Sequence, residues 1–349
     1  MMVECHPSAP HVGAHLDTDC RSIIKHEHFP LSAILYYRIG GTARFVLEAS
    51  SVADVFEAVE FVRANAIERF MVVGLGSNLL FPDGLFDGCV LRMSPGPQRQ
   101  VRELGKGLLG SFAGEELDHV ITFGFDRGYS GLEWAGGLPG TVGAAVRGNV
   151  GAFGGELKDV LETAEVLEMG EAGPTVRSLT NSDLNFAYRD SLVKQDRRLV
   201  VVSATFRLSR PDADALQASR ESYRANIEYR HRNHPMEYPT CGSVFKNIKE
   251  RDEVERMVGA WPDLKESVEG RWHGKVSMGY AINRLGLRGY RLGGAEISSK
   301  HSNFIVNLGD ATFSDVHGII RKVQERFFET FGFLPEPEVE IVGEQESSK

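Results

Sequence analysis

The chain of 349 residues has only four cysteines, Cys5, Cys20, Cys89 and Cys241, and none stands in a metal or redox motif. No C-x-x-C pair and no zinc-ligand spacing occurs, which excludes a zinc ribbon and a thioredoxin-like dithiol. Cys241 is a weak nucleophile candidate, because no histidine is placed for it and such residues usually pack as small hydrophobes. Free thiols are typical of a reducing cytosol, so we expect a cytoplasmic protein without a metal centre.

Long apolar runs and an excess of positive charge are also missing. No stretch approaches the length of a membrane-spanning helix, and the N-terminus lacks the apolar core of a signal peptide. The net charge is -9 at pH 7 and no basic stripe offsets it. We therefore expect neither nucleic acid nor membrane as a partner. Residues 1–21 are interpreted as a loose extension, and the triplet at residues 26–28, which is not H-E-x-x-H, as a polar turn.

Two nucleotide-binding fingerprints are absent as well. GLGSNLL, residues 74–80, follows a predicted strand as a nucleotide loop would, but a dinucleotide fingerprint requires glycine where Leu79 stands. No G-K-[ST] follows, so the segment is not a P-loop. Taken alone, it fits a tight turn with an asparagine as well as it fits a ligand loop.

The chain does contain an unusual concentration of glycine. Residues 128–155 hold ten glycines, and small or apolar residues fill most of the remainder. Glycine costs backbone entropy, but it permits positive φ, tight turns and main chain that lies against a ligand. Such a segment presents N–H groups to phosphates and apolar walls to a flat ring. A buried, irregular core loop is the alternative. Together with residues 74–80, the segment could hold the two ends of one extended cofactor.

Hydrophobic periodicity predicts an α+β organisation. Strands are expected at residues 70–73, 88–93, 164–169, 199–208 and 339–342, and helices at 51–66, 216–230 and 314–331. For the last helix we expect Ser314 as the N-cap and Phe328 within the buried stripe. Proline and aspartate in residues 209–215 indicate a domain boundary there.

Three short segments hold polar residues that could do chemistry. Arg189, in FAYRDSLVK, could bind a carboxylate or phosphate through two hydrogen bonds, or form a structural ion pair. Ser243, in CGSVFKN, could protonate a reacting carbon only with a relay or a neighbouring charge, and a buried structural serine is the alternative. In PEPEVEIVG, Glu336, Glu338 and Glu340 alternate along the chain. They either share one functional face or form a solvated acidic edge.

Seven segments in this order resemble one known family. They are YRIGG (residues 37–41), GLGSNLL, GLEWAGGLPGTVGAAVRGNVGAFGG, YRDS, GSVFKN, LGLRGYRLGGAEISSKHSNFIVN (residues 285–307) and PEPEVEIVG. Each is modest alone, but together they are similar to the UDP-N-acetylenolpyruvoylglucosamine reductases, flavoenzymes of bacterial cell-wall synthesis. The match runs over residues 37–343, most of the chain.

The resemblance implies a fold and a reaction. It implies an FAD-binding domain of the vanillyl-alcohol-oxidase type, with two α+β subdomains at residues 22–95 and 96–208, and an α+β substrate-binding domain at residues 209–349. NADPH would reduce FAD, and the enolpyruvyl ether of UDP-N-acetylglucosamine would then be reduced to UDP-N-acetylmuramate. We expect a monomer. Two alternatives stay open: another FAD oxidoreductase of the same cofactor fold, such as a hydroxy-acid or alcohol oxidase, and a non-catalytic nucleotide-sugar-binding protein.

By motif, the resemblance also implies roles for residues. Arg189 and Glu338 would polarise the enolpyruvyl carboxylate, and Ser243 would protonate the α carbon once hydride has reached the methylene carbon. The substrate contacts implied are Tyr188, Lys246 and Asn247. The cofactor contacts implied are Gly74, Leu75, Gly76, Ser77, Asn78, Leu79, Leu138, Pro139, Gly140, Thr141, Gly143, Ala144, Gly148, Asn149, Gly151 and Ala152.

The chain departs from the family pattern in three places. An insertion after YRDS, which carries a mobile tyrosine in one subclass, is absent, while residues 249–276 form a longer segment than in the short subclass. Where the family has a lysine shortly before GSxFKN, this chain has Asn233, with Arg230, Arg232 and His234 nearby. The side chains available to hold the substrate diphosphate therefore differ from the family pattern.

Overall fold

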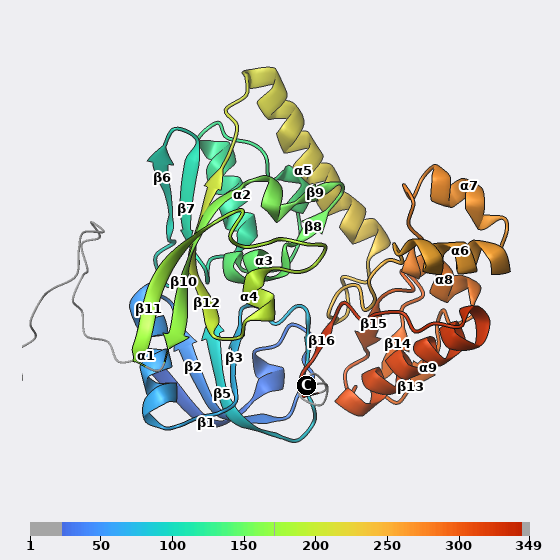
Figure 1. The fold of residues 1–349 in the computed structure, drawn as a ribbon, viewed down its shortest axis with the longest axis horizontal. Coiled ribbons are helices and arrows are strands. Elements are labelled where there is room, and N and C mark those ends of the chain that lie inside the picture. The colour runs from blue at the N-terminus through green and yellow to red at the C-terminus, as the bar shows by residue number, and fades with distance from the viewer. Residues whose placement is uncertain (1–22, 171, 344–349) are drawn as a thin grey trace, which may run out of the picture.

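A four-stranded sheet in the order β1-β2-β5-β3 forms the first subdomain (Figure 1). The computed structural model describes residues 23–170 and 172–343. Strands β2, β5 and β3 run parallel, while β1 pairs antiparallel with β2 at the edge. The bounds of this subdomain are β1 Ile24–Pro30, η1 Leu31–Ala33, β2 Thr42–Ala49, α1 Val52–Ala64, β3 Phe70–Val73, β4 Leu79–Leu80 and β5 Leu85–Met93.

A five-stranded antiparallel sheet in the order β11-β10-β12-β7-β6 forms the second subdomain. Between β7 and β10 the chain makes α2, α3 and the short hairpin β8–β9, and the glycine-rich residues 128–155 lie there. The bounds are β6 Val101–Gly105, β7 Leu108–Phe112, α2 Leu117–Asp126, η2 Glu133–Ala135, α3 Val142–Gly148, β8 Gly151–Ala152, β9 Gly155–Glu156, η3 Leu157–Asp159, β10 Leu161–Gly170, β11 Gly173–Thr180, α4 Leu192–Gln195 and β12 Leu199–Arg207.

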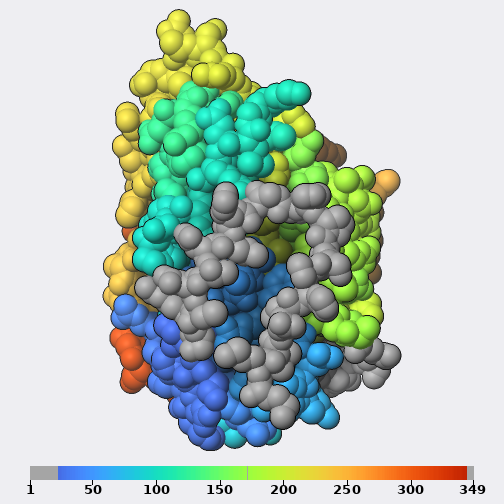
Figure 2. All heavy atoms as spheres, turned by 90° about the vertical axis from the view of Figure 1, so that its left-hand side faces the viewer, coloured from blue at the N-terminus to red at the C-terminus, as the bar shows by residue number. Residues whose placement is uncertain are grey.

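The two subdomains share one hydrophobic core. Leu47 of β2 and Val59 of α1 are buried in the same cluster as Val166 of β10 and Val202 of β12. Seen from the side opposite the C-terminal unit, the first subdomain, in blue, lies directly below the second, in blue-green (Figure 2). Because well-packed cores resist deformation, the two subdomains form a stiff frame for whatever binds between them.

A long helix, α5 (Ala213–Asn233), leads from the second subdomain to the C-terminal unit but packs against the second subdomain (Figure 1). The Tyr223 hydroxyl donates to Asp118 Oδ1 at 2.8 Å, and Asn226 Nδ2 donates to the carbonyl of Glu133 at 3.0 Å. The helix has no fully buried residue, so these polar contacts hold it in place. The chain therefore leaves the second subdomain only after α5, whereas the predicted domain boundary at residues 209–215 precedes this helix.

The C-terminal unit is a three-stranded sheet, β13-β14-β15, with α9 packed on β13 and β14. Its core includes Met278, Ile297 and Phe327 and extends to Tyr37 and Leu80 of the first subdomain. Helices α6 and α7 lie within the long segment of residues 249–276. The bounds are α6 Arg251–Ala260, α7 Leu264–Glu269, α8 Met278–Arg284, β13 Arg291–Leu292, β14 Ala295–Ile297, β15 Ile305–Asn307 and α9 Phe313–Phe331.

The last strand of the chain returns to the first subdomain. β16 (Glu340–Ile341) pairs in parallel with β4, directly after the glycine loop of residues 74–78. The N–H of Glu340 donates to the carbonyl of Asn78 at 3.0 Å. This crossing brings residues 336–340, distant in sequence, to the loop between β3 and β4.

Several predicted elements differ from the structure in their details. The strand at residues 70–73 is confirmed as β3, and Ser51 caps α1 by accepting from the N–H of Asp54 at 3.2 Å. The N-cap of α9 is Thr312, not Ser314, because the Thr312 hydroxyl is the group that accepts from the third N–H of the helix. Phe328 is 59% exposed and does not belong to the buried stripe. Residues 26–28 form part of strand β1, not a turn.

Among the described residues, no helix is both long and apolar enough to cross a membrane, and no three metal-ligating side chains cluster together. Cys89 and Cys241 are free and buried. The predicted extension at residues 1–21, with Cys5 and Cys20, lies outside the described residues.

Candidate active site

The two glycine segments meet in space and form one wall. The Ser77 hydroxyl, in the loop after β3, donates to the carbonyl of Pro139 at 3.0 Å. Thr141 begins α3 as its N-cap. A Cβ on Gly74 would lie 2.3 Å from Thr141 Oγ1, closer than any side-chain carbon can come, so this approach requires glycine.

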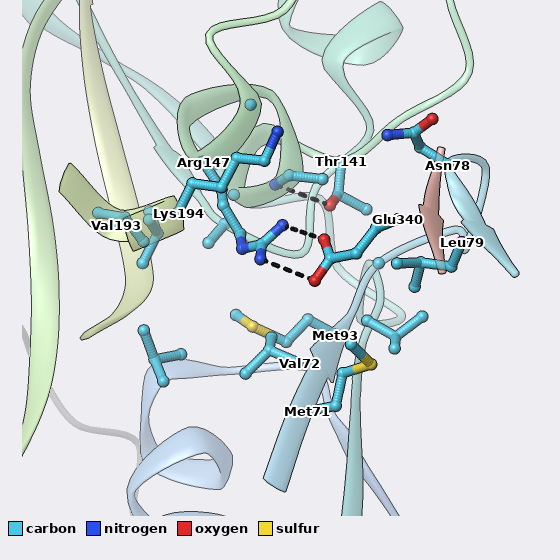
Figure 3. Close-up of a pocket in the computed structure, with 18 of the residues that line it drawn as sticks. Met71, Val72, Asn78, Leu79, Met93, Thr141, Arg147, Val193, Lys194 and Glu340 are labelled. Atoms are coloured by element: carbon cyan, nitrogen blue, oxygen red, sulfur yellow. Dashed lines mark hydrogen bonds and ion pairs between the residues drawn. The ribbon is translucent and has the colours of Figure 1, made fainter. Parts of the chain in front are cut away.

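Two adjacent cavities open on this wall. The first, of about 180 Å³, lies between residues 70–79, α3, α4 and β12, and is drawn in Figure 3. The second, of about 400 Å³, is bounded by α3, the β8–β9 hairpin, the end of α5 and residues 240–243. Both are lined by Ser77, Asn78, Ala144, Gly148 and Lys194. The two cavities therefore lie side by side along these five residues.

The residues predicted to bind the cofactor line one or both cavities, with one exception. Asn149 is fully buried outside them and ends α3 in a left-handed conformation with φ of 39°. Its Nδ2 donates to the carbonyl of Ala187 at 2.9 Å, and its Oδ1 accepts from the N–H of Lys158 at 3.1 Å. Asn149 therefore shapes the turn between α3 and the hairpin.

The walls suit a flat, elongated cofactor that carries phosphates, as FAD does. A Cβ on Gly148 would meet no atom within 4 Å, so the main chain there borders open cavity. Met71, Val72 and Met93 give the first cavity an apolar side (Figure 3). At the second cavity, Arg230 Nη2 is buried and has no hydrogen-bond partner within the described chain. A buried donor without a partner is typical of a site whose partner is a ligand.

Arg189 and Glu338 are paired on the wall of the second cavity. Arg189 Nε donates to Glu338 Oε1 at 2.7 Å, and each side chain is 19% exposed. Arg189 Nη2 donates to the carbonyl of Gly151 at 2.5 Å. The arginine backbone is left-handed, with φ of 57°. This conformation costs a non-glycine residue about 1–2 kcal/mol, so the surrounding contacts must hold it.

Ser243 lies on the same cavity because its segment is hydrogen-bonded to the segment of Glu338. The N–H of Glu338 donates to the carbonyl of Val244 at 2.7 Å, and the N–H of Lys246 donates to the carbonyl of Glu336 at 3.0 Å. Within the described chain, no hydrogen bond engages the Ser243 hydroxyl. One cavity thus brings together a guanidinium, a carboxylate and an unengaged hydroxyl.

Of the residues predicted to contact substrate, Tyr188 lies beside Arg189. The Tyr188 ring centre lies 5.0 Å from the Arg189 guanidinium, and burial raises the pKa of its hydroxyl. Lys246 forms an ion pair with Glu336. Asn247 Oδ1 accepts from the first N–H of α8 at 3.1 Å. None of the three lines either cavity, so their contact with substrate stays a prediction.

Sequence reasoning missed the charged residues of the first cavity (Figure 3). Arg147, from α3, donates to both carboxylate oxygens of Glu340, at 2.7 and 3.1 Å. Glu340 is only 7% exposed, so the interpretation as a solvated acidic edge is wrong for this residue. Lys194, from α4, also borders the cavity. The available signal was that Arg147 is the only basic residue in the glycine-rich segment of residues 128–155.

Aromatic side chains surround the mouth of the second cavity. Phe153, at the tip of the β8–β9 hairpin, meets Tyr229 of α5 edge to face, with 5.4 Å between ring centres. His234, just after α5, lies 4.8 Å from the Phe304 ring. Burial, His301 and nearby cations lower the pKa of His234 to about 4, so this imidazole is neutral at pH 7.

Cys241 lines the second cavity but is not prepared as a nucleophile. Burial raises the pKa of its thiol to about 12, and the side chain is 2% exposed. Its neighbour Tyr37 donates its hydroxyl proton to the carbonyl of Ile305 at 2.9 Å. The thiol therefore stays protonated, in agreement with its interpretation as a small hydrophobe.

Comparisons with known proteins point in one direction. A family model described as the C-terminal domain of UDP-N-acetylenolpyruvoylglucosamine reductase matches residues 234–342, and one described as an FAD binding domain matches residues 43–174. The chain is 34% identical over 318 residues to the UDP-N-acetylenolpyruvoylglucosamine reductase of Caldicellulosiruptor saccharolyticus, which covers 91% of this chain and 92% of the relative.

Two further relatives agree. The reductase of the same name from Listeria monocytogenes serotype 4b is 34% identical over 316 residues, covering 90% of this chain and 94% of the relative. The crystal structure of UDP-N-acetylenolpyruvylglucosamine reductase from Thermus caldophilus superposes with a TM-score of 0.68 at 27% identity, covering 91% of this chain and 98% of that chain.

Proposed function

The chain belongs to the family of UDP-N-acetylenolpyruvoylglucosamine reductases, and we propose that it performs the reaction of this family at the cavities described above. It is an FAD-dependent oxidoreductase that uses NADPH to reduce UDP-N-acetylglucosamine enolpyruvate to UDP-N-acetylmuramate, a peptidoglycan precursor. The alternative of an oxidase with the same cofactor fold is not favoured, because residues 234–342 match the C-terminal domain of the reductases.

One observation carries the assignment of the site. The cavity lined by Arg189, Ser243 and Glu338 adjoins the cavity lined by residues 74–79 and α3, and the two share five lining residues. Residues 74–79 and the N-terminal turn of α3 would hold FAD, because their main chain borders the cavities. When bound there, FAD supplies the hydride chemistry that links NADPH to the enol ether. The protein residues must then bind the substrate, control charge and deliver a proton.

Arg189 would stabilise the charge that develops on the substrate. Hydride addition to the methylene carbon leaves an electron pair on the α carbon, which is delocalised into the adjacent carboxylate. A preorganised cation at that carboxylate lowers the barrier. Glu338 binds Arg189 through Nε, and Nη2 binds the carbonyl of Gly151. This leaves Nη1 without a protein hydrogen bond among the described residues, available to the substrate carboxylate.

Ser243 would complete the reduction by protonating the α carbon. A serine hydroxyl is a weak acid, so it can give up its proton only to a strongly basic carbon and must then be reprotonated from solvent. The balance of the reaction is one hydride and one proton added across the carbon–carbon double bond. The Ser243 hydroxyl fits this task because no protein group in the described chain competes for its proton.

Further parts of the assignment rest on the resemblance. We propose that Tyr188, Lys246 and Asn247 contact the substrate. We also propose that the enzyme is a monomer of the cytoplasm, and that its domains divide at residues 22–95, 96–208 and 209–349. The packing of α5 on the second subdomain makes it a connector within this division.

A spectroscopic experiment tests the function. The purified protein should show flavin absorption bands. Addition of NADPH under anaerobic conditions should bleach these bands. Addition of UDP-N-acetylglucosamine enolpyruvate should then restore the bands with formation of UDP-N-acetylmuramate. A flavin that NADPH does not reduce would favour the oxidase alternative, and a reduced flavin that the enol ether does not reoxidise would contradict the substrate.

A further inference from the structure

Lys194 occupies the junction of the two cavities. Five residues border both cavities, namely Ser77, Asn78, Ala144, Gly148 and Lys194, and only Lys194 carries a charge. A ligand that extends from one cavity into the other would pass these five residues, Lys194 among them. Nothing in the motifs singled out Lys194, although it follows YRDS closely in sequence.

The Lys194 ammonium is incompletely satisfied by the protein. Its Nζ donates one hydrogen bond, to the carbonyl of Arg189 at 2.7 Å, and forms no ion pair with any described residue. An ammonium has three N–H donors, so two remain for other partners. The nearby carboxylate of Glu340 is already bound on both oxygens by Arg147 (Figure 3).

Lys194 is partly buried among charges of both signs. Burial lowers its pKa, and the charges of Lys246 and Arg147 lower it further, while Glu340 and Asp190 oppose the shift. A partly buried cation among other cations is costly unless an anion balances it. No carboxylate among the described residues forms an ion pair with Lys194, so the site is suited to a negatively charged ligand.

The backbone that carries Lys194 is held firmly. Ser191 is fully buried, caps α4 and donates its hydroxyl proton to the carbonyl of Arg147 at 2.7 Å. Asp190 Oδ2 accepts from Gln195 Nε2 at 2.7 Å. The ammonium is therefore presented from a rigid turn, as a preorganised binding group should be.

From this geometry we propose that Lys194 is an anion-binding residue of the FAD site, where its ammonium meets a negatively charged part of the cofactor at the junction of the cavities. The inference rests on the proposed function only in that FAD occupies these cavities. The anion has two sources on one cofactor: the diphosphate, which is always charged, and the ring system, which gains negative charge on reduction. Through its bond to the carbonyl of Arg189, the same residue also holds that arginine in its left-handed turn.

Cofactor affinity and reduction potential of Lys194→Met test the proposal without any measurement of turnover. We expect one of two outcomes for Lys194→Met. Either its apoprotein binds FAD at least tenfold more weakly than wild type, or its affinity for reduced FAD falls at least tenfold relative to its affinity for oxidised FAD. The second outcome corresponds to a fall of about 30 mV in midpoint potential for a two-electron couple. Lys194→Arg should keep most of the wild-type value, because it keeps the charge.

ADP, the part of FAD that carries the diphosphate but not the flavin ring, distinguishes the two sources of negative charge. If the diphosphate is the partner, the affinity of the apoprotein for ADP should fall in parallel with that for FAD. If the ring is the partner, ADP affinity should be unchanged while the midpoint potential falls. In either case the difference between wild type and Lys194→Met in the measured quantity should shrink as salt concentration rises.

Matched controls identify a nonspecific effect. Lys265→Met changes an exposed lysine of α7, outside both cavities, and should leave affinity and potential unchanged. Thermal unfolding of the apoproteins shows whether Lys194→Met is folded. The proposal is overturned if folded Lys194→Met binds FAD and ADP like wild type with an unchanged potential, or if Lys194→Arg loses as much as Lys194→Met. A wild-type protein that binds FAD but does not reduce the enol ether would instead contradict the proposed function alone.

Discussion

Glu338 and Glu340 stand two positions apart on the C-terminal segment, and each binds an arginine of the second subdomain in a different cavity. Glu338 meets Arg189 at 2.7 Å on the second cavity, and Glu340 meets Arg147 at 2.7 Å on the first. The short strand that carries Glu340 is hydrogen-bonded to β4 beside the glycine loop. The pairing of β16 with β4 therefore positions both the Glu340–Arg147 pair in the first cavity and the Glu338–Arg189 pair in the second.

The contributions of Arg147 and Glu340 to stability should be energetically coupled. Arg147→Met and Glu340→Gln should each lower the free energy of unfolding by about 2 kcal/mol, because each leaves a partly buried charge without its partner. The double variant should lose less than the sum, with a coupling of about 1–2 kcal/mol. Urea unfolding of the apoproteins measures all four corners of this cycle. Strictly additive losses would show that the two side chains do not stabilise each other.

Replacement of Ser243 should separate the two half-reactions. In Ser243→Ala, reduction of bound FAD by NADPH should proceed as in wild type, because this step needs no proton on the substrate. Reoxidation by the enol ether should slow by about 10²–10⁴-fold, the usual contribution of a general acid. Stopped-flow absorbance in the flavin bands reads both steps. The control is Ser178→Ala, on the exposed strand β11. Unchanged reoxidation in Ser243→Ala would make this serine structural.

Local signals in the sequence were sufficient for part of the main elements, whereas β6, β7, β11 and α2 were not predicted. Apolar periodicity located β3, α1 and α9, and the two glycine segments line the cavities. Polar residues on an exposed edge misled the prediction at β1, since its side chains are mostly exposed and show no apolar alternation. Within the glycine-rich segment, the short helix α3 was hidden because glycine weakens any helical pattern.

Pairings between distant residues could not be predicted from the sequence. Arg147 and Glu340 are 193 positions apart, and their bond depends on the crossing of β16 onto β4. Three alternating glutamates were visible, but which were buried was not. The structure leaves Glu336 exposed, where it forms an ion pair with Lys246, while Glu338 and Glu340 are largely enclosed. Burial of a charge depends on what the rest of the chain places over it, and local patterns do not contain that information.

A methyl group at Gly74 should open the contact between the two glycine segments. In Gly74→Ala, the new Cβ would lie 2.3 Å from Thr141 Oγ1 and 2.9 Å from its Cγ2, so one of the loops must move. We expect FAD binding to weaken at least tenfold and the unfolding free energy to fall by about 1–3 kcal/mol, as in other overpacked sites. Fluorescence titration of the apoprotein with FAD measures the first effect.

The matched control for this substitution is Gly259→Ala in α6. A Cβ there meets no atom within 4 Å, and alanine favours the helix by about 1 kcal/mol over glycine. This variant should bind FAD like wild type and unfold at a slightly higher temperature. If Gly74→Ala bound FAD equally well, the close approach of residue 74 to Thr141 would not be needed for the cofactor site.

The neutral imidazole of His234 should make the protein less stable in acid. Its pKa is about 4 in the folded chain and 6.5 when unperturbed, so between these values the unfolded chain binds a proton that the folded chain does not. Stability therefore falls as the pH drops from 6.5 toward 4, with about 1 kcal/mol lost at pH 5 after allowance for partial exposure. His234→Gln should lack this part of the pH dependence, as seen in urea midpoints at pH 7 and pH 5. His231→Gln, at an exposed position of α5, should keep it, and equal slopes in wild type and His234→Gln would contradict the burial argument.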